Sequence, residues 1–416
     1  MLSFEKAQEF YRKVRSQSVA LASPLSAEDC CVQPAEEASP TKWNLAHTTW
    51  FFETFLLERW EKPFHPFDVN FRVLFNSYYN AVGEKHPRPQ RGMLTRPSLD
   101  QVLHYRRNVD QRLLNLPERV WKDPEFHNLL ELGLNHEQQH QELLLTDQKL
   151  LFSYNPLAPA YHEVDLSRTP SRTQGAALSW KSFPEGMVHL GHTGEGFAFD
   201  NETPQHRVFV NAYQLASRLT TNAEYAQFVD QGGYQDPQYW LAEGWDWCQK
   251  SKRTQPLYWR KQDGKWYEFT LWGLGELDPV RPVVHVGYFE ADAFARWAHA
   301  RLPTEAEWEN AAQSVPLTGH FADSGEYHPR PAPEGELVQM LGDAWEWTSS
   351  SYSPYPGYQA APGAVGEYNG KFMVNQYVLR GGSCATPEGH IRKTYRNFFP
   401  TWACWQFSGI RLAREL

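Results

Sequence analysis

Two histidines one helical turn apart are the most chemically suggestive pair in this chain. His136 and His140 lie in the segment NHEQQHQE, residues 135–142. Side chains four residues apart project from the same face of a helix, so both imidazoles can reach one metal ion. A third ligand has to come from another segment. His47 is the best candidate because it sits among apolar and aromatic residues, where an imidazole without a partner would be costly.

The residue types leave the metal open. Three neutral imidazoles suit zinc, iron or copper and leave positions for water, dioxygen or substrate. The spacing HEQQH also matches the signature of zinc proteases, in which Glu137 would be the general base. The glutamine-rich continuation and the missing downstream ligand disfavour a protease. Paired histidines at this spacing also occur as ordinary core or surface residues.

Helices are the elements that must position these histidines. Up to about Ser153 the apolar residues recur every three or four positions, which is the helical period. The predicted helices span roughly 4–18, 40–59, 98–115 and 124–151. Ser39 is a candidate N-cap for the second of them, followed by a proline near the first turn. Four such helices form an antiparallel bundle, and bundle cores assemble metal sites from inward-facing side chains.

The second half of the chain has a different composition. Residues 155–178 are rich in Pro, Ala, Ser and Thr without a sustained period, which predicts a linker between a bundle at 1–154 and a second domain at 179–416. The 17 tryptophans concentrate after residue 180, among short strand-like runs and glycine turns. Helical stretches at 222–231 and 290–301 interrupt these runs, so the overall prediction is an α+β protein of two domains.

Charge and cysteine usage exclude several classes of protein. The formal net charge of -9 disfavours a nucleic-acid-binding protein, so small molecules are the expected partners. The five cysteines are scattered without CxxC spacing, which predicts neither a disulfide framework nor a thiolate zinc site. No basic leader and no apolar run of about 18 residues is found. We therefore expect a cytoplasmic protein without a membrane partner.

Several ordered segments resemble a known family. WNLAHTTWFFETFLL at 43–57 and the HxxxHxE segment resemble the DinB-like bundle that opens ergothioneine and ovothiol sulfoxide synthases. The second half resembles the formylglycine-generating-enzyme fold, a C-type-lectin-like domain. The segments that carry this second resemblance are LTTNAEY (219–225), RLPTEAEWE (301–309), LGDAWEWT (341–348), LRGGS (379–383) and FSGIR (407–411). The chain thus resembles the ergothioneine-biosynthesis sulfoxide synthase family nearly from end to end.

This resemblance implies a non-haem iron(II) enzyme that uses dioxygen. In the family, the ligands of Fe(2+) correspond here to His47, His136 and His140. The implied reaction joins the imidazole carbon of hercynine (trimethylhistidine) to the sulfur of cysteine and oxidises that sulfur to a sulfoxide. A phenol is a suitable proton donor. Tyr78 and Tyr79, in the segment NSYYN, resemble the subgroup that accepts free cysteine.

The resemblance also suggests substrate contacts. Arg88 and Arg91 can each clamp a carboxylate of the sulfur substrate with two parallel hydrogen bonds. Gln139, next to His140, can orient the bound imidazole. Asn397 resembles the position that holds the hercynine carboxylate, and the aromatic faces of Phe398 and Phe399 suit a trimethylammonium group.

Some alternatives stay open. The segment after Arg396-Asn397 lacks the acid and the arginine of family members that prefer gamma-glutamylcysteine, which favours cysteine. Cys404 stands where the cysteine-using subgroup is expected to have a charged residue, so a selenoneine synthase using a selenosugar is a rival, as is an ovothiol-type 5-histidylcysteine sulfoxide synthase. In another subgroup the phenol comes from the lectin-like side, where Tyr377 is a candidate. The non-enzyme alternative is a lectin-like binding module that holds no stoichiometric iron.

Overall fold

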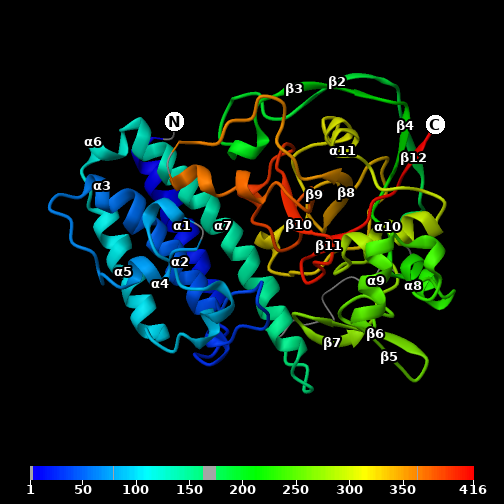
Figure 1. Cartoon of the computed structure of the whole chain (residues 1–416), viewed down its shortest axis with the longest axis horizontal. Helices are drawn as coiled ribbons and strands as arrows, with labels where there is room; N and C mark the ends of the chain where they lie inside the picture. The colour runs from blue at the N-terminus through cyan, green and yellow to red at the C-terminus, as the bar shows by residue number, and fades with distance from the viewer. Residues whose placement is uncertain (1–2, 78, 163–174, 363) are drawn as a thin grey trace. The chain divides into compact units, whose positions relative to one another are not determined.

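The computed structural model describes residues 3–77, 79–162, 175–362 and 364–416 and divides the chain into two compact units (Figure 1). Unit 1 comprises Met1–Pro156 together with Ala361–Tyr368. Unit 2 comprises Leu157–Ala360 together with Asn369–Leu416. Of the predicted linker, residues 163–174 lie outside the described residues. The predicted division of the chain at the linker did not include residues 361–368 in the bundle, whereas the structure groups them with unit 1.

The four predicted helices of unit 1 are confirmed. They are α1 (Phe4–Ala22), α2 (Thr41–Phe52), α5 (Leu99–Leu114) and α7 (Pro124–Ser153), with the shorter α3 (Glu58–Trp60), α4 (Phe71–Leu74) and α6 (Glu118–Trp121) between them. Helix α2 contacts both α5 and α7, and α1 contacts α7 (Figure 1). A π-helical segment, η2 (Glu53–Leu57), continues α2 into α3. No helix in the described part of the chain is long and apolar enough to cross a membrane.

Tertiary contacts override the helix cap that the sequence predicts at Ser39. Ser98 caps α5 through a capping box, as its residue type favours. Ser39 does not cap α2, whose N-cap residue is Pro40. The Ser39 hydroxyl instead accepts a hydrogen bond from Arg91 Nη1 at 2.9 Å, and its N–H donates to Asp147 Oδ2 at 2.9 Å. The cap prediction for Ser39 was wrong because these distant partners occupy its polar groups.

Helices α2 and α7 approach closely at Gly133. A Cβ atom at this position would lie 2.7 Å from the ring of Phe51 and 2.8 Å from the ring of Phe52. Glycine inside a helix costs roughly 1 kcal/mol relative to alanine, so it is used where close packing requires it. Gly133 is less than one helical turn before His136, and Phe51 is one turn after His47. The close packing therefore brings together the two histidine-bearing segments.

The described residues of unit 2 include short strands in four small sheets. The strands are β1 (Trp180–Phe183), β2 (Gly186–Leu190), β3 (His206–Val210), β4 (Tyr213–Ala216), β5 (Trp259–Gln262), β6 (Lys265–Thr270), β7 (Gly273–Glu276), β8 (Trp345–Ser351), β9 (Gln376–Arg380), β10 (Asn397–Pro400), β11 (Ser408–Gly409) and β12 (Ala413–Glu415). Their orders are β1-β4-β12, β10-β9-β8-β11, β2-β3 and β5-β6-β7. Neighbouring strands are antiparallel except for β8 and β11.

Four helices accompany these sheets in the described part of unit 2. They are α8 (Asn222–Asp230), α9 (Ala242–Ser251), α10 (Tyr288–Trp297) and α11 (Glu305–Ala312). The predicted helices at 222–231 and 290–301 correspond to α8 and α10. Helices α9 and α11 were not predicted from the sequence.

Buried ion pairs hold the irregular segments of unit 2. The guanidinium of Arg380 binds Glu305 at 2.9 Å and also Glu309. Arg411 binds Glu346 through Nε at 2.8 Å and Nη2 at 3.0 Å, and both side chains are fully buried. These residues belong to the segments that carry the family resemblance. Their role in unit 2 is therefore to tie distant loops together.

Candidate metal centre

Three histidines converge in the core of unit 1. The ligand nitrogens of His47, His136 and His140 all lie within 4.8 Å of one another. His136 Nε2 is 3.3 Å from Nε2 of His47 and 3.2 Å from Nε2 of His140. Helix α7 presents two of these imidazoles one turn apart, and α2 supplies the third. The structure thus brings together the three histidines that the sequence singled out.

The outer nitrogens of two imidazoles identify their tautomers. His47 Nδ1 lies 2.6 Å from the carbonyl oxygen of Phe75, and His140 Nδ1 lies 2.9 Å from Oδ1 of Asn44. An imidazole that donates from Nδ1 carries its lone pair on Nε2. Both lone pairs point to His136 Nε2, which can donate a proton to only one of them. Converging lone pairs with outer hydrogen-bond partners are the arrangement of a metal-binding site.

Burial keeps this cluster neutral. It lowers the pKa of His136 to about 4, and it lowers the pKa of His47 and His140 well below their ordinary value. The neighbouring histidines lower the pKa of those two residues further. A histidine must be deprotonated to bind a metal. The three imidazoles are therefore ready to act as ligands at neutral pH, and a divalent transition metal fits this donor set.

Aromatic and cationic groups border the cluster. The rings of Trp43 and Trp50 both stack on His47, with centroids 4.6 Å and 5.6 Å away. The guanidinium of Arg91 lies 3.4 Å above the Trp43 ring and is buried. Arg88, in the same short helix η4 (Arg88–Met93), donates to the carbonyl of Glu37. Both arginines contribute to the lowered pKa of His140, so this side of the cluster is electropositive and suits an anionic group.

The tyrosine pair is only partly described. Tyr78 lies outside the described residues. Tyr79 is buried and packs its ring against Trp50 and Phe55, with centroids 5.6 Å and 5.3 Å apart. Trp50 is one of the rings stacked on His47. Tyr79 therefore belongs to the aromatic wall of the cluster.

Sequence reasoning missed Tyr368. Its hydroxyl donates to Oε1 of Gln139 at 3.0 Å, and its ring centroid is 5.7 Å from that of His136. The surrounding segment, PYPGYQAAPGAVGEYNG, has no period and no recognisable motif. The other candidate from the second half, Tyr377, lies on β9 in unit 2 and stacks on Tyr288 at 3.9 Å. Tyr368 is therefore a phenol of the second half that lies beside the histidines.

Glu367 holds this segment in unit 1. Its carboxylate accepts hydrogen bonds from the backbone N–H of Asn80 at 2.9 Å and of Ala81 at 2.8 Å. These two residues begin η3 (Asn80–Val82), directly after Tyr79. The same contact thus positions Tyr368 and the backbone that directly follows Tyr79.

The remaining predicted contacts lie in unit 2. Asn397, Phe398 and Phe399 form β10, which pairs with β9. The side chain of Asn397 accepts from the N–H of Phe398 at 2.9 Å, and the Phe398 ring stacks on Tyr352 at 4.1 Å. The structure therefore places the predicted hercynine-binding residues in a different unit from Arg88, Arg91 and Gln139.

Glu137 cannot be the base of a zinc protease. It is fully buried and accepts from Ser18 Oγ at 2.6 Å, from Arg15 Nη1 at 2.9 Å and from Arg106. Burial alone would raise its pKa, but Arg106 and Arg15 outweigh that effect and leave the pKa below the ordinary value. The side chain binds two guanidinium groups, so the protease interpretation of HEQQH is wrong. Glu137 instead ties α7 to α1 and α5.

Cys404 is a buried thiol of unit 2. Arg253 Nη2 lies 3.4 Å from its sulfur, and burial raises its pKa to about 12. All five cysteines are free, as their spacing predicted. A neutral, buried thiol is a poor nucleophile, so the structure supports no thiol chemistry at this position.

Comparisons with known proteins agree with this architecture. Residues 11–144 match the DinB superfamily, and residues 172–334 and 329–416 match the sulfatase-modifying factor enzyme 1-like domain. The hercynine oxygenase of Mycobacterium tuberculosis is 31% identical over all of both chains. The hercynine oxygenase of Mycolicibacterium thermoresistibile is 33% identical over 91% of this chain and 88% of that protein. The formylglycine-generating enzyme of Streptomyces coelicolor is 28% identical over 55% of this chain and 84% of that protein.

Fold and site together define a class of two-domain proteins, in which a DinB-type helical bundle with three convergent histidines precedes a domain of the formylglycine-generating-enzyme type. The full-length relatives specify the family within this class. The chain belongs to the hercynine oxygenase family of ergothioneine-type sulfoxide synthases. The predicted fold class and the predicted family are both confirmed.

Proposed function

We propose that this chain is an iron(II)-dependent, dioxygen-using sulfoxide synthase that joins hercynine to cysteine in ergothioneine biosynthesis. The observation that carries the proposal is the cluster of His47, His136 and His140 in a chain whose full-length relatives are hercynine oxygenases. A relative over part of the chain, in Schizosaccharomyces pombe, is named ergothioneine biosynthesis protein 1. That name supports the assignment to this pathway.

The reaction needs a redox-active metal. Forming the C–S bond removes one hydrogen from the imidazole carbon and one from the thiol, and dioxygen supplies one oxygen atom to sulfur while the other leaves as water. This four-electron balance excludes zinc as the active metal, because zinc has no redox chemistry. Iron(II) held by the three histidines would activate dioxygen and hold the two organic partners together.

Residues of unit 1 would bind the sulfur substrate. Arg91 is fixed by Ser39 and by the Trp43 ring, and it lies on the electropositive side of the cluster with Arg88. A buried, stacked guanidinium binds a carboxylate with little loss of freedom. We assign Arg88 and Arg91 to the carboxylate of cysteine.

Gln139 and a phenol would control the proton. Tyr368 donates to Gln139 Oε1, and Gln139 lies next to His140 on α7, so we assign the Gln139 amide to orienting the substrate imidazole. The phenol beside His136 can pass a proton to the site. We assign this role either to Tyr368 or to the pair Tyr78 and Tyr79. Replacing each tyrosine in turn by phenylalanine would distinguish these two assignments.

Residues of unit 2 would recognise hercynine. We assign its carboxylate to Asn397 and its trimethylammonium group to the aromatic faces of Phe398 and Phe399. A quaternary ammonium has no N–H group and is recognised through such faces. The relatives' names favour hercynine over the unmethylated histidine of the ovothiol reaction.

The test is anaerobic reconstitution with iron(II), followed by oxygen, hercynine and one of three donors: cysteine, gamma-glutamylcysteine or a selenosugar. Mass spectrometry should show a cysteine-dependent sulfoxide adduct, and His136→Ala should abolish it. An adduct with the selenosugar alone would transfer the assignment to selenoneine synthesis. Bound iron with no adduct from any donor would refute the substrates, and no iron binding would refute the metal centre.

A further inference from the structure

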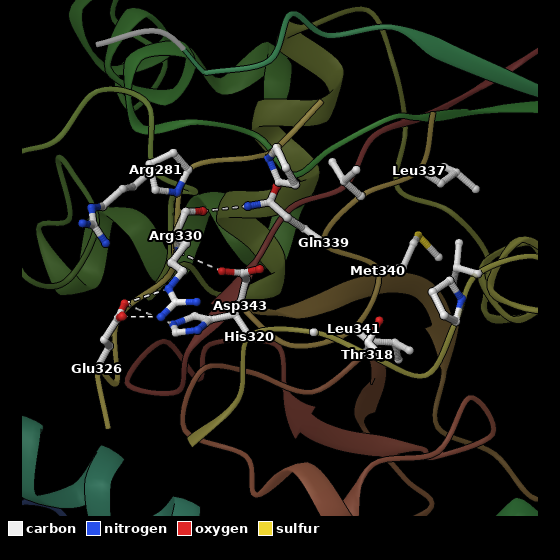
Figure 2. Close-up of a pocket in the computed structure, with 16 residues that line it drawn as sticks. Arg281, Thr318, His320, Glu326, Arg330, Leu337, Gln339, Met340, Leu341 and Asp343 are labelled. Atoms are coloured by element: carbon white, nitrogen blue, oxygen red, sulfur yellow. Dashed lines mark hydrogen bonds and ion pairs between the residues drawn. The ribbon is translucent and has the colours of Figure 1, made fainter. Parts of the chain in front are cut away.

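A second candidate site lies in unit 2 and shares no residue with the metal centre. A cavity of about 650 Å³ is lined by residues from Val315 to Asp343, the segment that connects α11 to β8 in the sequence, with Arg281 on one side (Figure 2). Volumes of this size are typical of small-molecule sites. None of the roles proposed above uses it.

Asp343 is the unusual acid of this cavity. It is 5% exposed and adopts φ +56°, a left-handed conformation that is uncommon outside glycine. Its Oδ1 accepts from the N–H of Arg330 at 2.8 Å, and no group among the described residues donates to its other carboxylate oxygen. Burial raises its pKa to about 7. The second carboxylate oxygen of Asp343 therefore has no hydrogen-bond donor among the described residues.

His320 adds a second acceptor to the same wall. Its Nε2 lies 2.9 Å from the carbonyl oxygen of His328, so Nε2 carries the proton and Nδ1 carries the lone pair. Nδ1 is buried and has no hydrogen-bond partner among the residues that the structure describes. Burial lowers the pKa of this histidine to about 4, which keeps the imidazole neutral. Both unsatisfied groups of the wall are thus acceptors, and they call for a ligand that donates.

The charges around Asp343 indicate the sign of that ligand. Arg330 pairs with Glu326 (Figure 2), and Arg281 pairs with Asp278 at 3.0 Å. Each arginine of the cavity thus has its own carboxylate. Arg330, Arg281 and Arg411 stabilise the ionised form of Asp343, but each of them is paired with another carboxylate, so these groups together carry one net negative charge when Asp343 ionises. A cation would complete the site.

The rest of the cavity sets the shape of the ligand. Leu337 and Met340 lie to the right of this polar cluster in Figure 2, and Val315 and Pro316 add further apolar surface. An apolar body of a few carbon atoms can lie on this wall while a cationic head faces the acceptors. A quaternary ammonium cannot donate a hydrogen bond, so hercynine does not have the required head.

We propose that this cavity binds a small primary organic ammonium, whose N–H groups donate to Asp343 and His320 and whose apolar body lies against Leu337 and Met340. The proposal does not depend on the chemistry of the metal centre.

The test measures binding of three probes to the full-length chain by isothermal titration calorimetry at pH 8. The probes are n-butylammonium, tetramethylammonium and butan-1-ol, which differ in charge and in N–H or O–H donors. We expect n-butylammonium to bind at least tenfold more tightly than the other two. Equal binding of tetramethylammonium would overturn the requirement for a donor, and equal binding of butan-1-ol would overturn the requirement for charge.

Three variants locate the binding. Asp343→Asn keeps an acceptor for Arg330 and suits a positive φ, so it should fold and bind n-butylammonium at least tenfold more weakly. Thr318→Trp places a large side chain at an exposed position of the cavity and should also block binding. Glu334→Gln removes a nearby exposed carboxylate that does not line the cavity and should bind normally. Unchanged affinity for n-butylammonium in the first two variants would refute the proposal, and so would no binding by the unmodified chain. If a variant fails to fold, the comparison of the three probes on the unmodified chain still tests the proposal.

Discussion

Units 1 and 2 both bury ion pairs that tie segments together, and unit 1 also buries a cluster of neutral histidines. In unit 1 the long helices satisfy their own backbone hydrogen bonds, so polar side chains of α7 are available for a functional cluster. In unit 2 the strands are short, and Arg411 reaches the carbonyls of Ala216 and Val338 as well as Glu346. The buried arginines of unit 2 therefore hold together loops that regular secondary structure does not connect. Changes to the histidines of unit 1 should cost function, whereas changes to the arginines of unit 2 should cost stability.

The largest functional effect is expected for His136→Ala. Removing the central imidazole takes away a ligand, so iron affinity and turnover should fall by more than the roughly 10–100-fold that outer-shell changes cost. The thermal midpoint of the metal-free protein should hardly change. His104→Gln alters an exposed histidine of α5 and is the control. Stoichiometric iron in His136→Ala would contradict the site.

The largest stability effect is expected for Arg411→Met in unit 2. The substitution leaves Glu346 buried without its charged partner, which costs about 3–5 kcal/mol. Urea denaturation would measure the loss of free energy of unfolding. The double variant Arg411→Met, Glu346→Leu removes both charges and should recover a large part of that loss. A double variant as unstable as the single one would show that the ion pair is not the cause.

A pH-dependent effect is expected at Asp343. Its pKa is about 7 in the folded chain and 3.8 ordinarily, so the folded state holds the proton more tightly. Stability should therefore fall as pH rises from about 4 to about 7, by up to a few kcal/mol. His320, Glu326, Arg281 and Arg330 surround this acid. These four residues titrate in the Asp343→Asn variant as well. Subtracting the free energy of unfolding of that variant from that of the parent at each pH therefore isolates the contribution of the Asp343 carboxyl. A difference that does not vary with pH would contradict the prediction.

Packing between the histidine-bearing helices can be tested with Gly133→Ala. Alanine favours the helix by up to about 1 kcal/mol, but its methyl group would collide with Phe51 and Phe52. Overpacking costs about 1–3 kcal/mol, so we expect a net loss of stability together with weaker iron binding. Gly275→Ala, where nothing lies within 4 Å of the new Cβ, should be within about 0.5 kcal/mol of the parent. A stabilised Gly133→Ala variant would show that α2 and α7 can move apart freely.

The smallest effect is expected for Glu367→Ala. It removes two hydrogen bonds from the N–H groups of Asn80 and Ala81, which are worth about 1.5–3 kcal/mol each when the acceptor is charged and less at a half-exposed site. Amide hydrogen exchange should accelerate several-fold in 79–83 and 364–369 without a change in global stability. Glu84→Ala, an exposed acid in the same loop, is the control. Unchanged exchange in both segments would mean that Glu367 does not dock them.

Much of the bundle follows from local sequence. The apolar period predicts α1, α2, α5 and α7 because a helix repeats every 3.6 residues, and a spacing of four places His136 and His140 on one face. The order of the motif segments predicts the family, because each segment alone is short but their succession along one chain is specific. The same segments did not reveal that Glu305 and Arg380 would form a buried pair.

Only the tertiary structure decided the remaining features. Tyr368 meets Gln139 across 229 residues of sequence, Ser39 binds Arg91 rather than capping its helix, and the cavity at Asp343 forms where several loops meet. A helical period or a cap preference reports on neighbours within a few residues. Hydrogen bonds and burial depend on which distant surfaces pack together, and neither has a local pattern in the sequence. The sequence by itself therefore determined the helices, the paired histidines and the family, whereas the tertiary structure decided the partners of each buried polar group.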